Sequence, residues 1–456
     1  MPRAKIWVTL ALCAATAAPA TAQKPDLVLI VTDDLDARTA RLMPRVQSLV
    51  AGQGVSFERA YVTNPLCAPS RASILTGQYA HNHGVLTNQT ASGGFAKFRR
   101  SEPVALPTWL RAAGYHTVLL GKYLNGYPSS REPGHVAPGW SEWFALFGGY
   151  HFYKYFVNHD GDVLHYGRAA ADYETDVLAA RLEGVIRGAG TEPLFLYLAP
   201  SAPHHPARPA RRHESALPDA KAPRPPSWLE PDVSDKPAWV RGEPASPEAG
   251  GRIDQIERRR RQSLLAVDEL LDALFLALQK TGRLPNTYVV FTSDNGFQLG
   301  EHRQVGKGTP YEEAIRVPLY VRGPGVPVAR TRDEAVLNID LAPTLAGLAG
   351  AKPAIAVDGV SFARLLGADP GSGAWRRDFL VEHWSEDPGD IPSFTALRSG
   401  SLCYVEYATG EREYYDLAQD PYQLQNRSAT TPLATLKPLA DRLGRLRTCK
   451  AESCRE

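Results

Sequence analysis

Four apolar, β-branched runs along the chain stop abruptly at polar or charged residues. They are DLVLIVTDD from Asp26, YHTVLLGKY from Tyr115, PLFLYLAPSAPHHP from Pro193 and TYVVFTSDNG from Thr287. Continuous apolar runs of this length are typical of strands that are buried on both faces of a parallel sheet. We therefore predict four strands of one mostly parallel sheet, with polar residues gathered at their carboxyl ends.

Helical patterns lie between the predicted strands. The clearest runs from Gln255 to Lys280, where the turn Thr281-Gly282 ends it and leucine and valine recur at helical spacing, at Leu264, Val267, Leu271, Leu274 and Leu278. Strands that alternate with helices predict an α/β fold with helices on both faces of the sheet, and ligands in such folds bind beyond the carboxyl ends of the strands. The Pro-, Arg- and Ala-rich segment from Pro203 to Gly251 indicates a long surface loop within the same domain.

After Gly371 the pattern changes to short alternating runs: FLVEHW, SFTALRSG, SLCYVEYA and EREYYDL. Alternation with period two is typical of antiparallel strands that are half buried. A final helix is expected from about Leu433 to Leu446. We therefore predict a main domain over residues 23–370 and a small antiparallel α+β subdomain over residues 371–456.

Composition and charge exclude some classes of protein. The chain has 456 residues, of which 43% are hydrophobic and 22% charged, so it can build a large globular core. Its formal net charge of +2 does not favour a nucleic-acid partner, and any attraction for anions must be local. The basic run Arg258 to Arg261 indicates a solvated or inter-element ionic face of the long helix, with contact to an anionic polymer as the alternative.

The first residues have the layout of a cleavable secretory signal. Arg3 and Lys5 precede an apolar run that ends in the small residues Ala20-Thr21-Ala22. An uncleaved anchor is the alternative, although the run is short for a membrane span. We predict a signal peptide over residues 1–22, a secreted or periplasmic protein, and no stable membrane insertion.

Four cysteines remain once Cys13 leaves with the predicted signal. The spacing of Cys449 and Cys454 suits a short disulfide loop, and Cys403 indicates a small buried apolar residue in a strand. Cys67 is left over in an apparent polar turn, LCAPSR. An unpaired thiol in an oxidising compartment is a liability, so Cys67 either has a disulfide partner or is no longer a thiol.

Hard oxygen donors follow two of the predicted strands. Asp33-Asp34 comes at the end of the first and Asp294-Asn295 at the end of the fourth. Three carboxylates and an amide suit Ca²⁺ or Mg²⁺ and lack the soft ligands that zinc usually takes. A turn or helix cap could explain either pair alone, but two pairs at matching strand ends favour a metal site.

Cations and potential cations are expected at the same edge of the sheet. They are Arg71, Lys122, His204, His205 and Lys307. A divalent ion surrounded by such side chains would bind a tetrahedral oxyanion and neutralise charge that develops in the transition state. Each of these residue types alone is more often a solvated surface charge than a ligand, so the prediction depends on their joint placement after strand ends.

The run Cys67-Ala68-Pro69-Ser70-Arg71, followed by Thr76-Gly77, resembles the signature of type I sulfatases. The similarity continues through TDD, GKYLN, GWSEW, APHHP, SDNG and IRVPLYVRGPG. It is closest to the secreted N-acetylglucosamine-6-sulfatases and the related heparan-sulfate 6-O-endosulfatases, where GKYLN, HNH and GWxxW also occur. The resemblance implies an alkaline-phosphatase-like fold and a sulfuric ester hydrolase.

The same resemblance implies that Cys67 is chemically modified and is no longer a thiol. In the family this cysteine is converted by a formylglycine-generating enzyme to the aldehyde formylglycine, whose hydrate is the nucleophile toward sulfur. It also implies that one Ca²⁺ is bound by the modified Cys67 together with Asp33, Asp34, Asp294 and Asn295. Arg71 would hold the hydrate.

Sulfate-binding roles are implied for Lys122, His204 and Lys307, and His204 or Lys307 would protonate the leaving alcohol. His205 is the alternative to His204 if the loop is registered one residue differently. His83 is assigned to the substrate pocket, with a structural role as the alternative for it and for its neighbour His81.

One departure bears on the branch of the family. Many arylsulfatases follow the equivalent of Lys122 with Trp-His, whereas this chain has Tyr123-Leu124-Asn125, as glucosamine-6-sulfatase-like members do. That difference leaves the base for sulfate elimination unassigned. We expect a 6-O-sulfated amino sugar or related carbohydrate as substrate; the alternatives are a broad arylsulfatase, a phosphonate or phosphodiester hydrolase of the same superfamily, and a non-enzymatic binder of sulfated glycans.

Overall fold

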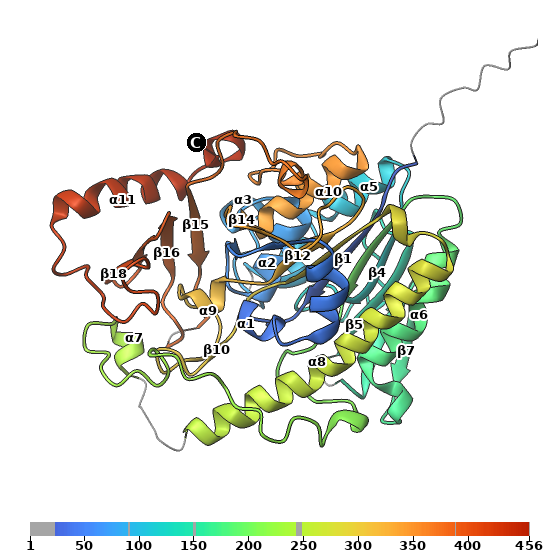
Figure 1. The fold of residues 1–456 in the computed structure, drawn as a ribbon, viewed down its shortest axis with the longest axis horizontal. Coiled ribbons are helices and arrows are strands. Elements are labelled where there is room, and N and C mark those ends of the chain that lie inside the picture. The colour runs from blue at the N-terminus through green and yellow to red at the C-terminus, as the bar shows by residue number, and fades with distance from the viewer. Residues whose placement is uncertain (1–22, 90–91, 149–151, 243–248, 388, 456) are drawn as a thin grey trace, which may run out of the picture.

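A ten-stranded sheet forms the centre of the protein in the computed structural model, which describes residues 23–89, 92–148, 152–242, 249–387 and 389–455 (Figure 1). The predicted signal peptide lies outside these residues. The strand order is β13-β2-β12-β9-β1-β8-β4-β5-β6-β7. The four predicted strands are its central members: β1 (Asp26–Thr32), β4 (His116–Lys122), β8 (Leu194–Ala199) and β9 (Thr287–Ser293).

These four strands are parallel neighbours, in the order β9-β1-β8-β4. The prediction of a mostly parallel sheet is therefore confirmed, and the carboxyl ends of all four strands meet at one edge. Strand β5 (Glu142–Phe147) continues the parallel run beside β4. Antiparallel or short strands complete the sheet: β2 (Val55–Phe57), β6 (Tyr155–His159), β7 (Asp162–Tyr166), β12 (Leu319–Arg322) and β13 (Arg330–Arg332).

Helices cover both faces of the sheet, as predicted (Figure 1). Leu27, Leu29 and Val31 of β1 belong to one core with α2 (Cys67–Thr76), α5 (Leu106–Ala112) and α10 (Leu341–Ala349). Val28 and Ile30 belong to a second core with α6 (Glu174–Gly188) and α8 (Ala249–Lys280). Successive side chains of a strand point to opposite faces, so one buried run builds both cores.

Helix α8 starts at Ala249, earlier than the predicted Gln255. The pair Gly250-Gly251 disguised its first turn in the sequence, since glycine is a poor helix former. Gly250 is buried against the ring of Trp228, where an added Cβ would lie 3.3 Å from the ring. Tertiary packing thus sets the start of the helix.

The segment from Pro203 is also less exposed than predicted. It contains α7 (Ala238–Arg241), and Ser227 and Lys236 within it are fully buried. Lys236 donates to the carbonyl of Leu424 at 2.6 Å. The prediction of a surface loop is wrong for this part, because it packs against the C-terminal region.

The C-terminal region forms the predicted antiparallel sheet from β15 (Asp378–His383), β16 (Phe394–Ser399), β17 (Leu402–Tyr407) and β18 (Arg412–Asp416). Helix α11 (Leu433–Leu446) has the predicted bounds and packs on β15 and β16. The Cys449–Cys454 disulfide is present, and Cys403 is buried. Residues of β15 share a core with β1, so the division at residue 371 stays a prediction.

Short elements connect these layers: α1 (Ala37–Ala40), α3 (Ala80–His83), α4 (Gly94–Phe98), α9 (Glu312–Ile315), β3 (Ala60–Tyr61), β10 (Gln298–Leu299), β11 (Val305–Gly306) and β14 (Val336–Leu337). Over the described ranges, no helix has both the length and the apolar character needed to cross a bilayer.

Candidate active site at the carboxyl ends of the strands

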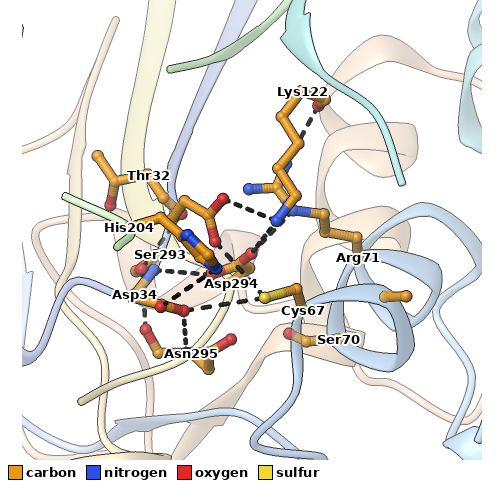
Figure 2. Close-up of polar contacts among 12 residues, drawn as sticks. Thr32, Asp34, Cys67, Ser70, Arg71, Lys122, His204, Ser293, Asp294 and Asn295 are labelled. Carbon is orange, nitrogen blue, oxygen red and sulfur yellow. Dashed lines mark hydrogen bonds and ion pairs between the residues drawn. The ribbon is translucent and has the colours of Figure 1, made fainter. Parts of the chain in front are cut away.

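Polar side chains from four parallel strands meet at the carboxyl edge of the central sheet (Figure 2). Asp33-Asp34 follows β1, Asp294-Asn295 follows β9, Lys122 ends β4 and His204 follows β8. Backbone hydrogen bonds tie the strand ends together, because Asp33 N donates to Ala202 O at 3.3 Å and Asp294 N donates to Thr32 O at 3.1 Å. The sheet register therefore sets the position of each side chain.

Cys67 lies at the centre of this group. It is the first residue of α2 and is completely buried, so the predicted polar turn is wrong. Asn88 Oδ1 accepts a hydrogen bond from Ala68 N at 2.9 Å and caps one free N–H of that first turn. The Sγ atom of Cys67 lies 3.5 Å from Asp33 Oδ1, 3.8 Å from Asp34 Oδ1 and 2.7 Å from Lys307 Nζ.

Cys67 has no disulfide, and of the described cysteines only Cys403 is also free. Burial raises the pKa of the Cys67 thiol, against the lowering effect of Lys122 and Lys307. An unmodified cysteine here is therefore a neutral thiol at physiological pH, and a poor nucleophile.

Each carboxylate of the group faces a cation. Lys122 Nζ lies 2.7 Å from Asp33 Oδ2, Lys307 Nζ contacts Asp34 Oδ1, and Arg71 Nε donates to Asp294 Oδ2 at 2.8 Å. Arg71 and Asp294 are both fully buried, so this pair forms where solvent cannot screen it.

These charges decide the ionisation of the two aspartates after β1. Burial opposes ionisation of Asp33, but Lys122, His204 and Arg71 hold its pKa below the ordinary value. The pKa of Asp34 is lowered in the same way, with Lys307 and His204 outweighing burial. Burial and the neighbouring Asp33 raise the pKa of Asp294.

The group has the donors of a hard cation site. One ligand atom from each of Asp33, Asp34, Cys67 and His204 can be chosen so that all lie within 4.8 Å of one another. Asn295 donates its Nδ2 to Asp34 Oδ1 at 2.8 Å, while its buried Oδ1 has no hydrogen-bond partner in the described part of the chain. A buried carbonyl oxygen without a donor fits a cation ligand.

Both carboxylate oxygens of Asp294 accept hydrogen bonds, so its role as a metal ligand stays a prediction. Its Oδ2 accepts from Arg71, and its Oδ1 accepts from Asp34 N at 3.1 Å. Asp33, Asp34 and Asn295 therefore fit Ca²⁺ or Mg²⁺ by geometry, and Asp294 lies directly beside them.

His204, rather than its neighbour His205, faces the carboxylates. Its Nε2 lies 3.7 Å from Asp34 Oδ2, while its Nδ1 bonds to the backbone carbonyl of His205 at 2.6 Å. Burial lowers the pKa of His204, against the raising effect of Asp33 and Asp34. The ring of His205 is exposed.

The two histidines of the HNH stretch have contacts elsewhere. His83 Nε2 bonds to Ser73 Oγ at 3.1 Å, and its Nδ1 accepts from Val85 N at 3.1 Å. Burial lowers the pKa of His83 to about 3. His81 bonds to Glu382 Oε2 at 2.8 Å and to Cys449 O at 2.9 Å, which joins α3 to the C-terminal region. The structure brings neither ring into the group around Cys67.

Arg260 is a buried part of the site that the sequence did not indicate. Its Nη2 donates to Asp34 O at 2.6 Å, and its guanidinium lies over the ring of Phe297, 4.1 Å from the centroid. Asp36 Oδ2 lies 3.5 Å from Arg260 Nη2. The interpretation of Arg258 to Arg261 as a solvated or inter-element ionic face therefore holds at this position in its second form, because Arg260 joins α8 to the residues after β1.

Two clefts open from the group. One of about 350 Å³ is lined by Asp34, His204 and Lys307 on one side and by residues of α8 on the other. The second, of about 190 Å³, is lined by Lys122 and Ser201 together with Asn125, Tyr127 and Phe147. A substrate can therefore reach the buried charges from solvent.

Comparison with known proteins gives a family for this arrangement. Residues 25–351 match the family described as Sulfatase, and residues 300–448 match the family described as N-sulphoglucosamine sulphohydrolase, C-terminal. The chain is 34% identical to a human N-acetylglucosamine-6-sulfatase over 95% of this chain and 86% of that protein. It is 32% identical to an arylsulfatase of Volvox carteri over 98% of this chain and 79% of that one.

Among solved structures, the fold is similar to that of a protein described in complex with its substrate D-glucosamine-2-N,6-O-disulfate. The TM-score is 0.80 at 23% identity, over 93% of this chain and 97% of that one.

Proposed function

Because this chain belongs to the sulfatase family and is a sulfuric ester hydrolase, we propose that it removes the 6-O-sulfate of a sulfated amino sugar. We further propose that it uses formylglycine at position 67 and one bound Ca²⁺. The observation that carries the proposal is the position of Cys67: its side-chain atom lies against two carboxylates and a lysine, at 3.5 Å from Asp33 and 2.7 Å from Lys307.

Asp33, Asp34, Asp294, Asn295 and residue 67 would hold the cation. Ca²⁺ fits because the donors are hard oxygens, and the partnerless Oδ1 of Asn295 supports such a role. When bound, the cation would polarise oxygen atoms and formylglycine would supply a nucleophile toward sulfur.

The remaining side chains act on charge and protons. Each of the two carboxylates after β1 has its own lysine, with Lys122 at Asp33 and Lys307 at Asp34. Two ammonium groups so placed would bind the oxygens of the transferred group and stabilise the negative charge that grows on them. Arg71, held by Asp294 at 2.8 Å, would orient the nucleophile on residue 67.

His204 is the proposed proton donor to the leaving alcohol. Its Nδ1 donates to the carbonyl of His205, so Nε2 is the atom that faces Asp34, and Nε2 has a proton to give only in the imidazolium, which Asp33 and Asp34 favour against burial. Lys307 lines the same cleft and is the alternative donor. We assign no substrate contact to His83, because its Nε2 bonds to Ser73 Oγ and its Nδ1 accepts from Val85 N.

The sugar preference is supported by the 34% identity to N-acetylglucosamine-6-sulfatase over nearly the whole chain. The second candidate is a broad arylsulfatase, which the 32% identity to the Volvox enzyme supports. We also propose export with removal of residues 1–22, in keeping with the signal-like composition of that segment.

The test combines chemistry and substrate. The protein, co-expressed with a formylglycine-generating enzyme, should give a peptide across Leu66 to Arg71 whose mass is that of formylglycine at position 67. It should release sulfate from glucosamine 6-sulfate faster, in kcat/KM, than from 4-methylumbelliferyl sulfate. An unmodified cysteine in fully active enzyme would refute the nucleophile, and a higher kcat/KM on the aryl ester would favour the arylsulfatase.

A further inference from the structure

The larger cleft, which we call the α8 cleft, extends beyond the residues needed for sulfate chemistry. Asp34, His204 and Lys307 form its catalytic side, and Gln255, Ile256 and Arg259 of α8 form its far wall. At about 350 Å³ it has room for more than a sulfate group. The part of the substrate that carries the reacting sulfate would therefore lie against α8.

Arg259 is an uncompensated charge in this cleft. It is exposed, and it makes no hydrogen bond or ion pair within the described residues. Neighbouring arginines of the same region are paired: Arg224 with Asp254 at 2.6 Å, and Arg212 with Asp176 at 2.6 Å. Arg258 and Arg261 of the same helix also have no partner within the described residues, but neither lines the α8 cleft, so Arg259 is the arginine that brings a free charge to it.

The other charged groups of the α8 cleft have partners. Arg260 donates to Asp34 O and lies over Phe297, and Lys307 contacts Asp34 Oδ1. Asp34 is the only carboxylate among the described lining residues, and it also accepts from Asn295. No acidic side chain of the lining is left to neutralise Arg259, so the far wall is positively charged.

Apolar surface lies beside this charge. Ile256, Phe297 and Val305 line the α8 cleft, and Val305 is 47% exposed. A pyranose ring presents C–H groups that pack on such surfaces, while its anionic substituents need donors. An arginine with free N–H groups is well suited to a sulfate or a carboxylate because it can bind two oxygens at once.

We propose that the α8 cleft binds a second anionic group of the substrate, and that Arg259 is the specificity-determining residue that recognises it. This inference rests on the proposed function and narrows it: the preferred substrate is a 6-O-sulfated amino sugar that carries another sulfate or carboxylate. That group can belong to the same sugar, as an N-sulfate, or to an adjacent uronic acid.

The test compares Arg259→Gln with wild type on three substrates: glucosamine 6-sulfate, glucosamine 2-N,6-O-disulfate, and a uronic acid–glucosamine 6-sulfate disaccharide. We expect Arg259→Gln to raise KM about fivefold for at least one doubly anionic substrate, which is the size of one exposed charge contact. Its kcat, and its KM for glucosamine 6-sulfate, should stay within twofold of wild type. The substrate that loses affinity identifies the source of the second anion.

Arg261→Gln is the matched control. Arg261 lies on the same helix and loses the same charge, but it lines a different cleft with Leu217 and Leu264. It should behave as wild type on all three substrates. Equal effects of Arg259→Gln on singly and doubly anionic sugars, or equal effects of the two variants, would overturn the proposal.

Inhibition of aryl sulfate hydrolysis distinguishes a failure of the anion-site proposal from a failure of the proposed sugar specificity. If wild type fails to hydrolyse any of the sugars, the proposed sugar specificity is wrong. The doubly anionic sugars are then measured as competitive inhibitors of 4-methylumbelliferyl sulfate hydrolysis. A fivefold weaker inhibition constant in Arg259→Gln alone would support the anion site, and no difference from Arg261→Gln would refute it.

Discussion

Replacing Arg260 with methionine should weaken both the fold and the cation site. The charge-assisted hydrogen bond from its Nη2 to Asp34 O, at 2.6 Å, contributes about 1.5 to 3 kcal/mol. The buried contact with the Phe297 ring, 4.1 Å from the centroid, adds about 1 to 2 kcal/mol. Methionine keeps part of the packing, so we expect a net loss of about 3 kcal/mol in the free energy of unfolding.

This loss can be converted to a change in melting temperature. An unfolding entropy of about 2.1 cal/mol/K per residue gives about 1 kcal/mol/K for 456 residues. Arg260→Met should therefore lower Tm by about 3 °C in calorimetry or differential scanning fluorimetry. Because Arg260 holds the backbone of Asp34, the Ca²⁺ concentration that gives half-maximal activity should also rise, by about tenfold, the size expected when a group that orients a metal ligand is removed.

Arg261→Met is the control for this experiment, since it removes the same side chain one residue along α8 without contact to Asp34. It should leave Tm within 1 °C and the Ca²⁺ dependence unchanged. A normal Ca²⁺ dependence in Arg260→Met would refute the idea that Arg260 positions Asp34, even if Tm falls.

Three other predictions follow from the site and the core. Cys67→Ala and Cys67→Ser should each abolish turnover while the circular dichroism spectrum stays that of wild type, because either side chain fits the first turn of α2; sulfatase activity in the alanine variant would contradict the nucleophile. Removal of divalent ions with a chelator should stop turnover and added Ca²⁺ should restore it, whereas full activity of metal-free enzyme would exclude the ion. Burial raises the pKa of Asp268 from 3.8 to about 6, so the folded state binds the proton more tightly and loses about 3 kcal/mol as pH rises from about 4 to 6. Asp268→Asn keeps the acceptor for Val46 N and removes this dependence, so its Tm should exceed that of wild type more at pH 7 than at pH 4.5, and a constant difference would contradict the assignment.

The sequence predicted the centre of the sheet well and its edges poorly. Strands β1, β4, β8 and β9 are buried on both faces, so their residues form continuous apolar runs. Strand β7 is exposed along its length, and Val163 and Leu164 lie in solvent. A short strand without a buried face has no periodic signal, which explains why β7 was missed.

The site residues also fall into those that the sequence could place and those that it could not. Asp33, Lys122 and Asp294 follow directly from the rule that parallel strands end at one edge, because the register of the sheet fixes them. Histidine roles depend on the tertiary contacts of each ring, which is why His204 faces the carboxylates while His83 bonds to Ser73.

Helix α8 gives the clearest example of what local sequence cannot provide. Four consecutive arginines point in four directions around the helix, about 100° apart. Arg259 is exposed and Arg260 is 1% exposed. Only the packing of α8 on the strand-end loops decides which arginine contacts Asp34 and which one faces the cleft.

The burial of Cys67, Ser70 and Arg71, each with no exposed surface, has a consequence for biosynthesis. A maturation enzyme that must bind this short motif cannot reach it once the chain has folded. On the proposed chemistry, Cys67 would have to be oxidised before the chain folds during export. A molecule that folds before oxidation would keep an unmodified Cys67. The specific activity of a preparation would therefore depend on the fraction of molecules oxidised before folding. Adding the maturation enzyme to the purified, folded protein would not raise that activity.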